Sequence, residues 1–327
     1  MKKLWIGMAV ALTALIVCGC AMAETMGTCG DGLNWSHTDD GVLTISGTGS
    51  MPDYTGATAP WGTAMERVVI EEGVTSIGAE AFLHCRSLTG ITIPDSVTGI
   101  GALAFCECRA LKSITIPDSV AVIGEAAFAK CSGLTAVNIP AGVTRIESQT
   151  FDGCESIISV DIPDSVTRIS NDAFHGCSIL TGVAIPDSVT DAEGAFGACS
   201  NLREICVSDT HSTLAIKDGV LFSKDGSVLV QFPAGSTITA YTVPEGVTRI
   251  ASGAFSGCKR LTGIIIPDTV QKIDNGAFSG CSSLTDIVIP DSVTAIDFSA
   301  FSDCGSLTNV SVPKALSGKL DSSVFDG

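Results

Sequence analysis

The chain has 327 residues, of which 45% are hydrophobic and 16% charged, and this composition argues against a mainly disordered protein. Its 35 acidic residues outnumber its 18 basic residues, which gives a net charge of -17. A surface of that sign repels phosphate groups, so we expect neither a nucleic-acid partner nor binding to an anionic membrane surface.

The N-terminus has the pattern of a secretory signal peptide. Lys2 and Lys3 precede an apolar run over residues 4–17, and the segment ends in the small-residue pattern Ala21-Met22-Ala23. We therefore predict a signal peptide over residues 1–23, cleavage after Ala23, and a protein that is secreted or located at the cell surface. No other stretch approaches the roughly 18 apolar residues of a membrane span, so we expect no transmembrane segment in the mature chain.

An alternative concerns the end of this segment. Val17-Cys18-Gly19-Cys20 loosely resembles the lipobox of bacterial lipoproteins, although Cys18 is a poor residue at its position. If this segment works as a lipobox, the mature protein carries a lipid anchor at Cys20.

Residues 24–66 predict an N-terminal β cap. Two apolar segments, one around Trp35 and one over residues 42–46, are separated by Asp39-Asp40-Gly41, which favours a hairpin turn. Trp35 and Trp61 would cover the first repeat, because the end of a repeat array needs a cap.

From residue 67 onward the chain is organised by a repeat of about 23 residues. Its consensus is L-x-x-I-x-I-P-D-S-V-T-x-I-G-x-x-A-F-x-x-C, and the segment Ile93-Pro94-Asp95-Ser96-Val97 recurs in full at 116–120, 162–166, 185–189 and 289–293. The repeat also places one phenylalanine and, three residues later, one cysteine in each unit. The phenylalanines are Phe82, Phe105, Phe128, Phe151, Phe174, Phe196, Phe255, Phe278 and Phe301.

Each unit predicts one coil of a solenoid. The alternation Ile91-Thr92-Ile93 indicates a short strand with one buried face, Pro94-Asp95-Ser96 indicates a turn, and the A-F-x-x-C segment indicates a short helical or 3-10 turn. One coil cannot bury its own apolar side, so the coils must stack as short parallel strands. We expect a rod or a shallow arc.

An insertion interrupts the period. Residues 208–242 contain 219–230, which reads as a hairpin with a Lys-Asp-Gly turn. The predicted organisation is therefore a signal peptide (1–23), a β cap (24–66), a first block of repeats (67–207), an inserted hairpin (208–242), and a second block with the C-terminal cap (243–327).

The repeat closely resembles the BspA-like, or Treponema pallidum type, leucine-rich repeat of bacterial surface and secreted proteins. The resemblance covers about residues 68–313 and rests on nine units in register. It implies a non-enzymatic curved solenoid on or near the cell surface that is used for adhesion to host matrix or to other cells.

The residues themselves show no enzyme or metal motif. The nine cysteines of the repeat are expected to be small buried side chains, because stacked parallel positions do not meet disulfide geometry. The sequence has no H-E-x-x-H, G-x-S-x-G or phosphate-loop motif, and Cys106-Glu107-Cys108 lacks a second pair of ligands. We therefore predict no enzyme activity, no cofactor and no metal.

The candidate binding surfaces are the residues that face outward. The strand face consists of the residue between the paired apolar residues of each first strand: Thr92, Thr115, Asn138, Asp161, Ala184, Cys206, Ile265, Val288 and Ser311. We predict partner binding at Thr92, Thr115, Asn138 and Asp161, and at Phe222, Lys224 and Asp225 of the inserted hairpin. A second outward row, Arg145, Arg168, Arg249 and Lys272, either binds a partner or simply offsets nearby acids.

These observations predict an exported protein that mediates protein-protein interaction, with cell-surface adhesion to host matrix or other cells as its role. The expected partner is a protein or glycoprotein. The alternative is a structural or spacer protein of the cell envelope that has no specific ligand.

Overall fold

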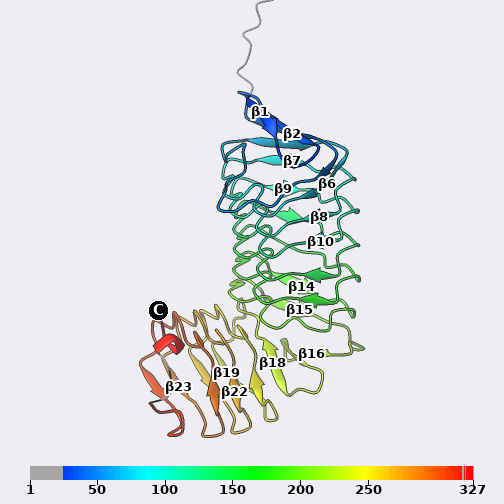
Figure 1. Cartoon of the computed structure of the whole chain (residues 1–327). Helices are drawn as coiled ribbons and strands as arrows, with labels where there is room; N and C mark the ends of the chain where they lie inside the picture. The colour runs from blue at the N-terminus through cyan, green and yellow to red at the C-terminus, as the bar shows by residue number, and fades with distance from the viewer. Residues whose placement is uncertain (1–24, 319, 321, 327) are drawn as a thin grey trace, which may run out of the picture.

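The computed structural model describes residues 25–318, 320 and 322–326, and the repeat region is wound into stacked coils (Figure 1). In a representative coil Ile114 and Ile116 are buried while Thr115 between them is exposed, as period-two alternation requires. The following turn is closed by a hydrogen bond from the Val120 N–H to the Pro117 carbonyl at 3.0 Å. The predicted leucine-rich repeat solenoid of short parallel strands is confirmed.

The first block has two rows of strands that run along the stack. The first row continues a small antiparallel sheet into parallel pairs, and contains β1 (Thr25–Thr28), β2 (Leu33–His37), β3 (Val42–Gly47), β5 (Arg67–Ile70), β7 (Gly90–Thr92), β9 (Ser113–Ile114), β11 (Ala136–Val137), β14 (Gly182–Ala184) and β15 (Glu204–Cys206). The second row contains β4 (Gly49–Ser50), β6 (Val74–Ile77), β8 (Gly99–Ile100), β10 (Val122–Ile123), β12 (Arg145–Ile146) and β13 (Arg168–Ile169).

The second block repeats this arrangement with its own two rows. The first row contains β19 (Ala240–Thr242), β21 (Gly263–Ile265), β23 (Asp286–Val288) and β25 (Asn309–Ser311). The second row begins in the insertion and contains β16 (Leu214–Lys217), β17 (Val220–Ser223), β18 (Val228–Gln231), β20 (Arg249–Ile250), β22 (Lys272–Ile273) and β24 (Ala295–Ile296).

Turns rather than regular helix close each coil on the side that carries the phenylalanine. Two residues of every such corner have a positive φ, for example 56° at Leu103 and 62° at Glu107, and these left-handed residues stop a helix from propagating. Within the described residues the only helix is the 3-10 turn η1 (Ser322–Val324) near the C-terminus. The corners are therefore tighter and less helical than the A-F-x-x-C segment predicts.

A ladder of aromatic rings runs through the middle of each block. In the first block Phe82 to Phe196 stack with ring centroids 5.2–5.6 Å apart, and Trp61 extends the ladder with a stacked contact to Phe82 at 5.7 Å. In the second block the rings run from Phe232 to Phe325 at 5.0–5.6 Å. The two ladders are not joined, because Phe196 stacks only on Phe174.

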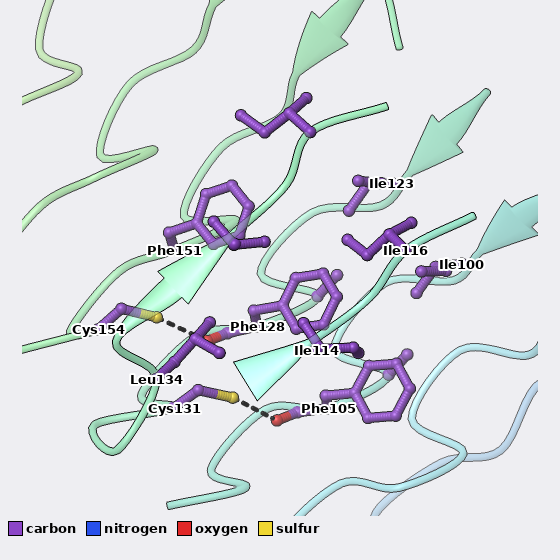
Figure 2. Packing of buried hydrophobic residues seen from close by; sticks show 14 of the residues in the cluster. Ile100, Phe105, Ile114, Ile116, Ile123, Phe128, Cys131, Leu134, Phe151 and Cys154 are labelled. Carbon is purple, nitrogen blue, oxygen red and sulfur yellow. Dashed lines mark hydrogen bonds between the residues drawn. The ribbon is translucent and has the colours of Figure 1, made fainter. Parts of the chain in front are cut away.

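The cysteines form a second ladder beside the rings. Cys131 donates its S–H to the Phe105 carbonyl at 3.1 Å, and Cys154 donates to the Phe128 carbonyl at 3.2 Å (Figure 2). Five further cysteines make the same bond one coil back: Cys108, Cys177, Cys199, Cys281 and Cys304. A small side chain with a weak donor thus adds a second hydrogen bond to a carbonyl that already accepts from a backbone N–H in almost every coil.

The N-terminal cap is a three-stranded antiparallel meander rather than a simple hairpin. Strands β2 and β3 pair antiparallel, as the Asp-Gly turn predicts, and β1 adds a third strand on the outer edge. Strand β3 then pairs parallel with β5, which joins the cap to the first coil. Trp35 and Trp61 meet edge to face at 6.4 Å over the end of the ring ladder.

The insertion forms a layer between the two blocks. Strands β16, β17 and β18 pair antiparallel, and β18 pairs parallel with β20 of the second block. Successive side chains of β17 point to opposite sides: Leu221 packs in the core of the first block, whereas Val220 and Phe222 pack in the core of the second. Strand β18 is shared in the same way, with Val230 in the first core and Leu229 in the second, so each block has its own core and two strands contribute to both.

The insertion changes the direction of the solenoid, which corrects the expectation of a single rod or shallow arc. Figure 1 shows the second block, coloured yellow to red, projecting sideways from the end of the first. On the strand side β15 and β19 do not pair, and the inserted chain of residues 208–239 separates them in the sequence. On the corner side the coils remain in contact, since the Ala198 N–H donates to the Ser256 carbonyl at 3.1 Å. Extra chain on one side only produces the bend, which we call the joint.

Candidate functional site

The strand face of the first block is a continuous exposed column. Thr92 pairs in register with Val69 of the preceding coil, and Asn138 forms a parallel bridge with Asp161. Thr92, Thr115, Asn138 and Asp161 are all exposed. The structure therefore brings the four predicted residues of this face together on one surface, at the spacing of the stacked strands.

Backbone bonds fix the geometry of this column. The Asn138 side chain donates to the Ile116 carbonyl at 2.7 Å, and its Oδ1 accepts from the Ile116 N–H at 3.1 Å. These two side-chain bonds continue the pairing of the two chain segments beyond the ends of strands β9 and β11. Asn138 is a structural member of the face, and Asp161 and Thr115 beside it present free polar surface.

The C-terminal part of the strand face has a different character. Ile265 and Val288 lie on β21 and β23 with exposed fractions of 64% and 66%, between the polar residues Thr242 and Ser311. At the end of the first block Cys206 is also exposed, and partial burial and the neighbouring Glu204 raise its pKa. A raised pKa keeps this thiol protonated and unreactive at neutral pH.

The predicted residues of the inserted hairpin line a groove of about 310 Å³. Lys217, Phe222, Lys224, Asp225 and Glu245 contribute to its walls. Phe222 is only 3% exposed, because its side of β17 packs in the core of the second block. Phe222 is therefore a buried residue at the floor of the groove rather than an exposed ring, and its part in partner binding stays a prediction.

Lys224 and Asp225 are exposed but tied to the hairpin. The Asp225 carboxylate accepts hydrogen bonds from the Ser223 hydroxyl at 2.6 Å, the Ser227 hydroxyl at 2.8 Å and the Ser227 N–H at 3.0 Å. These bonds lower the pKa of Asp225 to about 2. The Lys224 ammonium donates to the Asp209 carbonyl at 2.9 Å. Both side chains thus hold the turn, as is usual for Asp in tight turns.

The basic row of the second strands is matched by carboxylates. Arg145 lies 3.5 Å from Glu147, and Arg168 lies 3.1 Å from Asp191. Lys272 contacts Asp274 and Asp297, each at 2.9 Å. This row is therefore a set of ion pairs, in agreement with the interpretation that it offsets nearby acids.

Arg249 crosses the joint. Its guanidinium contacts Glu193 of the first block and Asp274 of the second, each at 2.6 Å, and these partners hold the pKa of Arg249 above its ordinary value. Sequence analysis places Arg249 on the outward row but cannot find Glu193, which lies 56 residues away. Because the insertion adds residues between Glu193 and Arg249, their separation is not a multiple of the 23-residue period, and the period does not predict that they pair.

The corner side of the first block carries two groups of charges. The Glu107 carboxylate accepts from Arg86 at 2.6 Å and from Arg109 at 3.0 Å, which lowers its pKa. Further along, the His175 Nδ1 lies 2.9 Å from the Asp152 carboxylate. The 23-residue spacing of Asp152 and His175 was the available signal for the second group, because residues one period apart are neighbours in adjacent coils.

His175 gives a prediction for pH dependence. The hydrogen bond to Asp152 raises the pKa of His175, so the protonated form favours the folded state. Its stabilising contribution is complete below the unfolded pKa of about 6.5 and is lost as pH rises through the folded pKa. We expect His175→Gln to lower the melting temperature more at pH 5.5 than at pH 8.5. Equal losses at both pH values would contradict a charged pair.

The described residues provide little for catalysis. Burial raises the pKa of Cys131 and Cys199 to about 12, so these thiols stay protonated and cannot serve as nucleophiles. Within the described ranges no group of three His, Cys, Asp or Glu side chains is placed to hold a metal ion. No helix in that part of the chain is long and apolar enough to cross a membrane. The predicted signal peptide and Cys20 lie outside the described residues.

Comparison with known protein families shows to which family the chain belongs. The model of the BspA type leucine-rich repeat region matches six copies, over residues 57–181, 123–224 and 231–327. The chain belongs to this family. A BspA type repeat explains why one phenylalanine, one cysteine and one I-x-I strand recur per coil. No protein of curated function matches the sequence.

Solved structures share both the repeat and the fold. A leucine-rich repeat protein from Eubacterium ventriosum is 31% identical with a TM-score of 0.64, over 90% of this chain and 75% of that one. A leucine-rich cell surface protein from Faecalibacterium prausnitzii is 26% identical with a TM-score of 0.67, over 88% of this chain and 94% of that one. The pneumococcal vaccine antigen PcpA, 16% identical with a TM-score of 0.55 over 89% and 82% of the two chains, shares the fold alone.

Proposed function

We propose that this BspA type protein is an exported, non-enzymatic adhesin that binds host matrix or other cells through the strand face of its first block. The observation that carries this proposal is the exposed register column of Thr92, Thr115, Asn138 and Asp161. Its backbone is fixed by the stack, so a partner meets a rigid surface and little ordering entropy opposes binding. The Faecalibacterium prausnitzii relative is described as a cell surface protein, which supports the proposed export of this chain to the cell surface.

The character of the face fits a protein or glycoprotein partner. Its exposed side chains are hydroxyl, amide and carboxylate groups with few aromatic residues, so we expect contacts spread over several coils rather than one dominant anchor. Repeated modest contacts give useful binding when many copies of the protein face many copies of a ligand.

The test is binding of the mature chain to immobilised collagen, fibronectin and laminin and to intact cells at physiological salt. The face variant is Thr115→Arg with Asp161→Arg. The matched control is Thr98→Arg with Glu125→Arg, which makes the same change of net charge at exposed positions away from the face. We expect at least about a tenfold loss of affinity in the face variant, which corresponds to about 1.4 kcal/mol of binding free energy. Placing an unfavourable charge within an interface costs at least that much. The control should change the affinity by less than about twofold.

Each outcome separates the alternatives. Saturable binding that falls only in the face variant supports the proposal. Saturable binding that is equal in both variants moves the site off the strand face. No saturable binding of the unaltered protein to any of these surfaces contradicts adhesion and favours the spacer protein of the cell envelope.

A further inference from the structure

A second concave surface lies at the joint, away from the strand face. Corner residues of both blocks line a groove of about 190 Å³, among them Asn171, Asp172, Ser256, Asn275, Ser279 and Phe298. Ligand sites favour such boundaries between packed units, because neither unit alone makes a closed concavity. The groove therefore exists only because the insertion turns the second block toward the corner side of the first.

Glycines hollow out this groove. Each corner has two residues with a positive φ, and the earlier of the two carries a side chain in the coils before the joint, as at Gln149 and Asp172, but is Gly194 in the last coil of the first block. At the joint the same position is Gly253 and Gly276, with φ of 61° and 60°. A Cβ on Gly276 would meet only the Ser279 Cβ, at 3.9 Å. The side chains that fill the corner elsewhere are thus missing where the blocks meet.

The walls of the groove are held in place by bonds across the joint. The Ala198 N–H donates to the Ser256 carbonyl across the joint, and within the second block the Gly253 N–H donates to the Asn275 carbonyl at 3.0 Å. The Arg249 guanidinium links Glu193 to Asp274 on the neighbouring row. A groove that is fixed before a ligand arrives loses little entropy on binding.

The polar groups of the groove have hydrogen-bonding capacity to spare. Within the described residues the Ser256 and Ser279 hydroxyls and the Asn275 side-chain amide have no hydrogen-bond partner, and the Asn275 Oδ1 is a buried unpaired acceptor. Hydroxyl and amide groups both donate and accept, and they carry no charge. Asp172 and His175 also line the groove, but each already has a partner, Asn171 and Asp152 respectively. The unpaired groups therefore suit a neutral ligand whose own groups also donate and accept.

The groove also presents one aromatic ring. Phe298 is 61% exposed, although the corresponding position of other coils holds small or polar residues such as Asn171, Ser252 and Asn275. An exposed phenylalanine beside unpaired hydroxyl and amide groups offers an apolar face next to hydrogen-bonding groups. A pyranose ring has the complementary surface, with C–H groups on its faces and hydroxyl groups around its edge.

We propose that the joint groove binds a single sugar ring of a glycan, with the ring against Phe298 and its hydroxyls hydrogen-bonded to Ser256, Ser279 and Asn275. The volume of about 190 Å³ is large enough for one monosaccharide. This site is independent of the strand face, so the protein would have one surface for proteins and a separate one for carbohydrate.

The test is binding of the mature chain to polyacrylamide-linked galactose, glucose, mannose, fucose, N-acetylglucosamine and N-acetylgalactosamine, with unsubstituted polyacrylamide as the blank. The variants are Phe298→Ala and Gly276→Gln, the second of which places a glutamine where Gln149 shows that one fits the same backbone. Their controls are Val122→Ala, which is also 61% exposed but lies outside the groove, and Gly219→Gln, at another positive-φ glycine with open space around it.

We expect saturable binding to at least one sugar, a loss of about tenfold in Phe298→Ala, no measurable binding in Gly276→Gln, and less than about a twofold change in either control. Circular dichroism and melting temperature check folding, and Phe298→Ala is decisive if Gly276→Gln does not fold. No binding to any sugar, or equal binding by Phe298→Ala and the unaltered protein, overturns the proposal. Matrix binding by the strand face is unaffected in these variants, so failure here leaves the proposed adhesin function standing.

Discussion

Phe128→Ala is expected to lower the free energy of unfolding by about 3–5 kcal/mol, the largest single-residue loss in the first block. Phe128 has no exposed surface and stacks on Phe105 at 5.3 Å and on Phe151 at 5.6 Å. Truncation removes both stacking contacts and leaves a cavity between two coils that cannot close up, because backbone hydrogen bonds fix the coil spacing.

The measurement is urea unfolding followed by circular dichroism, with hydrogen exchange to locate the damage. The stability of a stacked array is nearly one-dimensional, so exchange should rise first in the coils on either side of Phe128 and less in the second block. Val122→Ala is the control, because Val122 is exposed and its truncation should change stability by less than about 0.5 kcal/mol. A loss below about 1 kcal/mol in Phe128→Ala would show that the ring ladder is not the main support of the coils.

The second large effect comes from two substitutions at neighbouring residues, each of which should destabilise a different block. Leu221→Ala should cost about 2–5 kcal/mol and Phe222→Ala about 3–5 kcal/mol. The two residues are adjacent in β17, but Leu221 packs in the core of the first block and Phe222 in that of the second. Their positions on opposite faces of one strand make the location of the damage, rather than its size, the informative result.

Hydrogen exchange distinguishes the two variants. Leu221→Ala should raise exchange mainly in strands β14 and β15, whereas Phe222→Ala should raise it mainly in β20 and β22. Lys224→Ala, at an exposed position of the same hairpin, is the control and should change neither block. If both core variants loosen the same block, β17 does not act as a two-sided layer. Deleting residues 208–242 is not an equivalent test, because it removes packing from both cores at once.

The regular coils could be predicted from the sequence because their contacts are between residues one period apart. Ile114 pairs with Val137 and Arg145 with Arg168, each 23 residues on. Once the period is known, these neighbours, the ring ladder and the exposed strand face all follow. The same reasoning would have found the pair His175 and Asp152, which also lie 23 residues apart.

The burial of Phe222 was within reach of the sequence but was missed. Val220, Leu221 and Phe222 form an unbroken apolar run, and such a run indicates a strand that is buried on both faces. Placing Phe222 among the outward-facing residues of an inserted hairpin led to the expectation of an exposed ring. The repeat on both sides of the insertion should have suggested that its strands continue the stack.

The sequence by itself determined the coil, its core and its outward rows, because each of these depends on local alternation and on contacts at a constant period. Only the tertiary structure decided the direction of the second block, the pairing of Arg249 with Glu193 and the groove beside Phe298. These features depend on which side of the stack the inserted chain occupies. That side is set by the simultaneous packing of β17 against two cores, and no fixed spacing in the sequence records it.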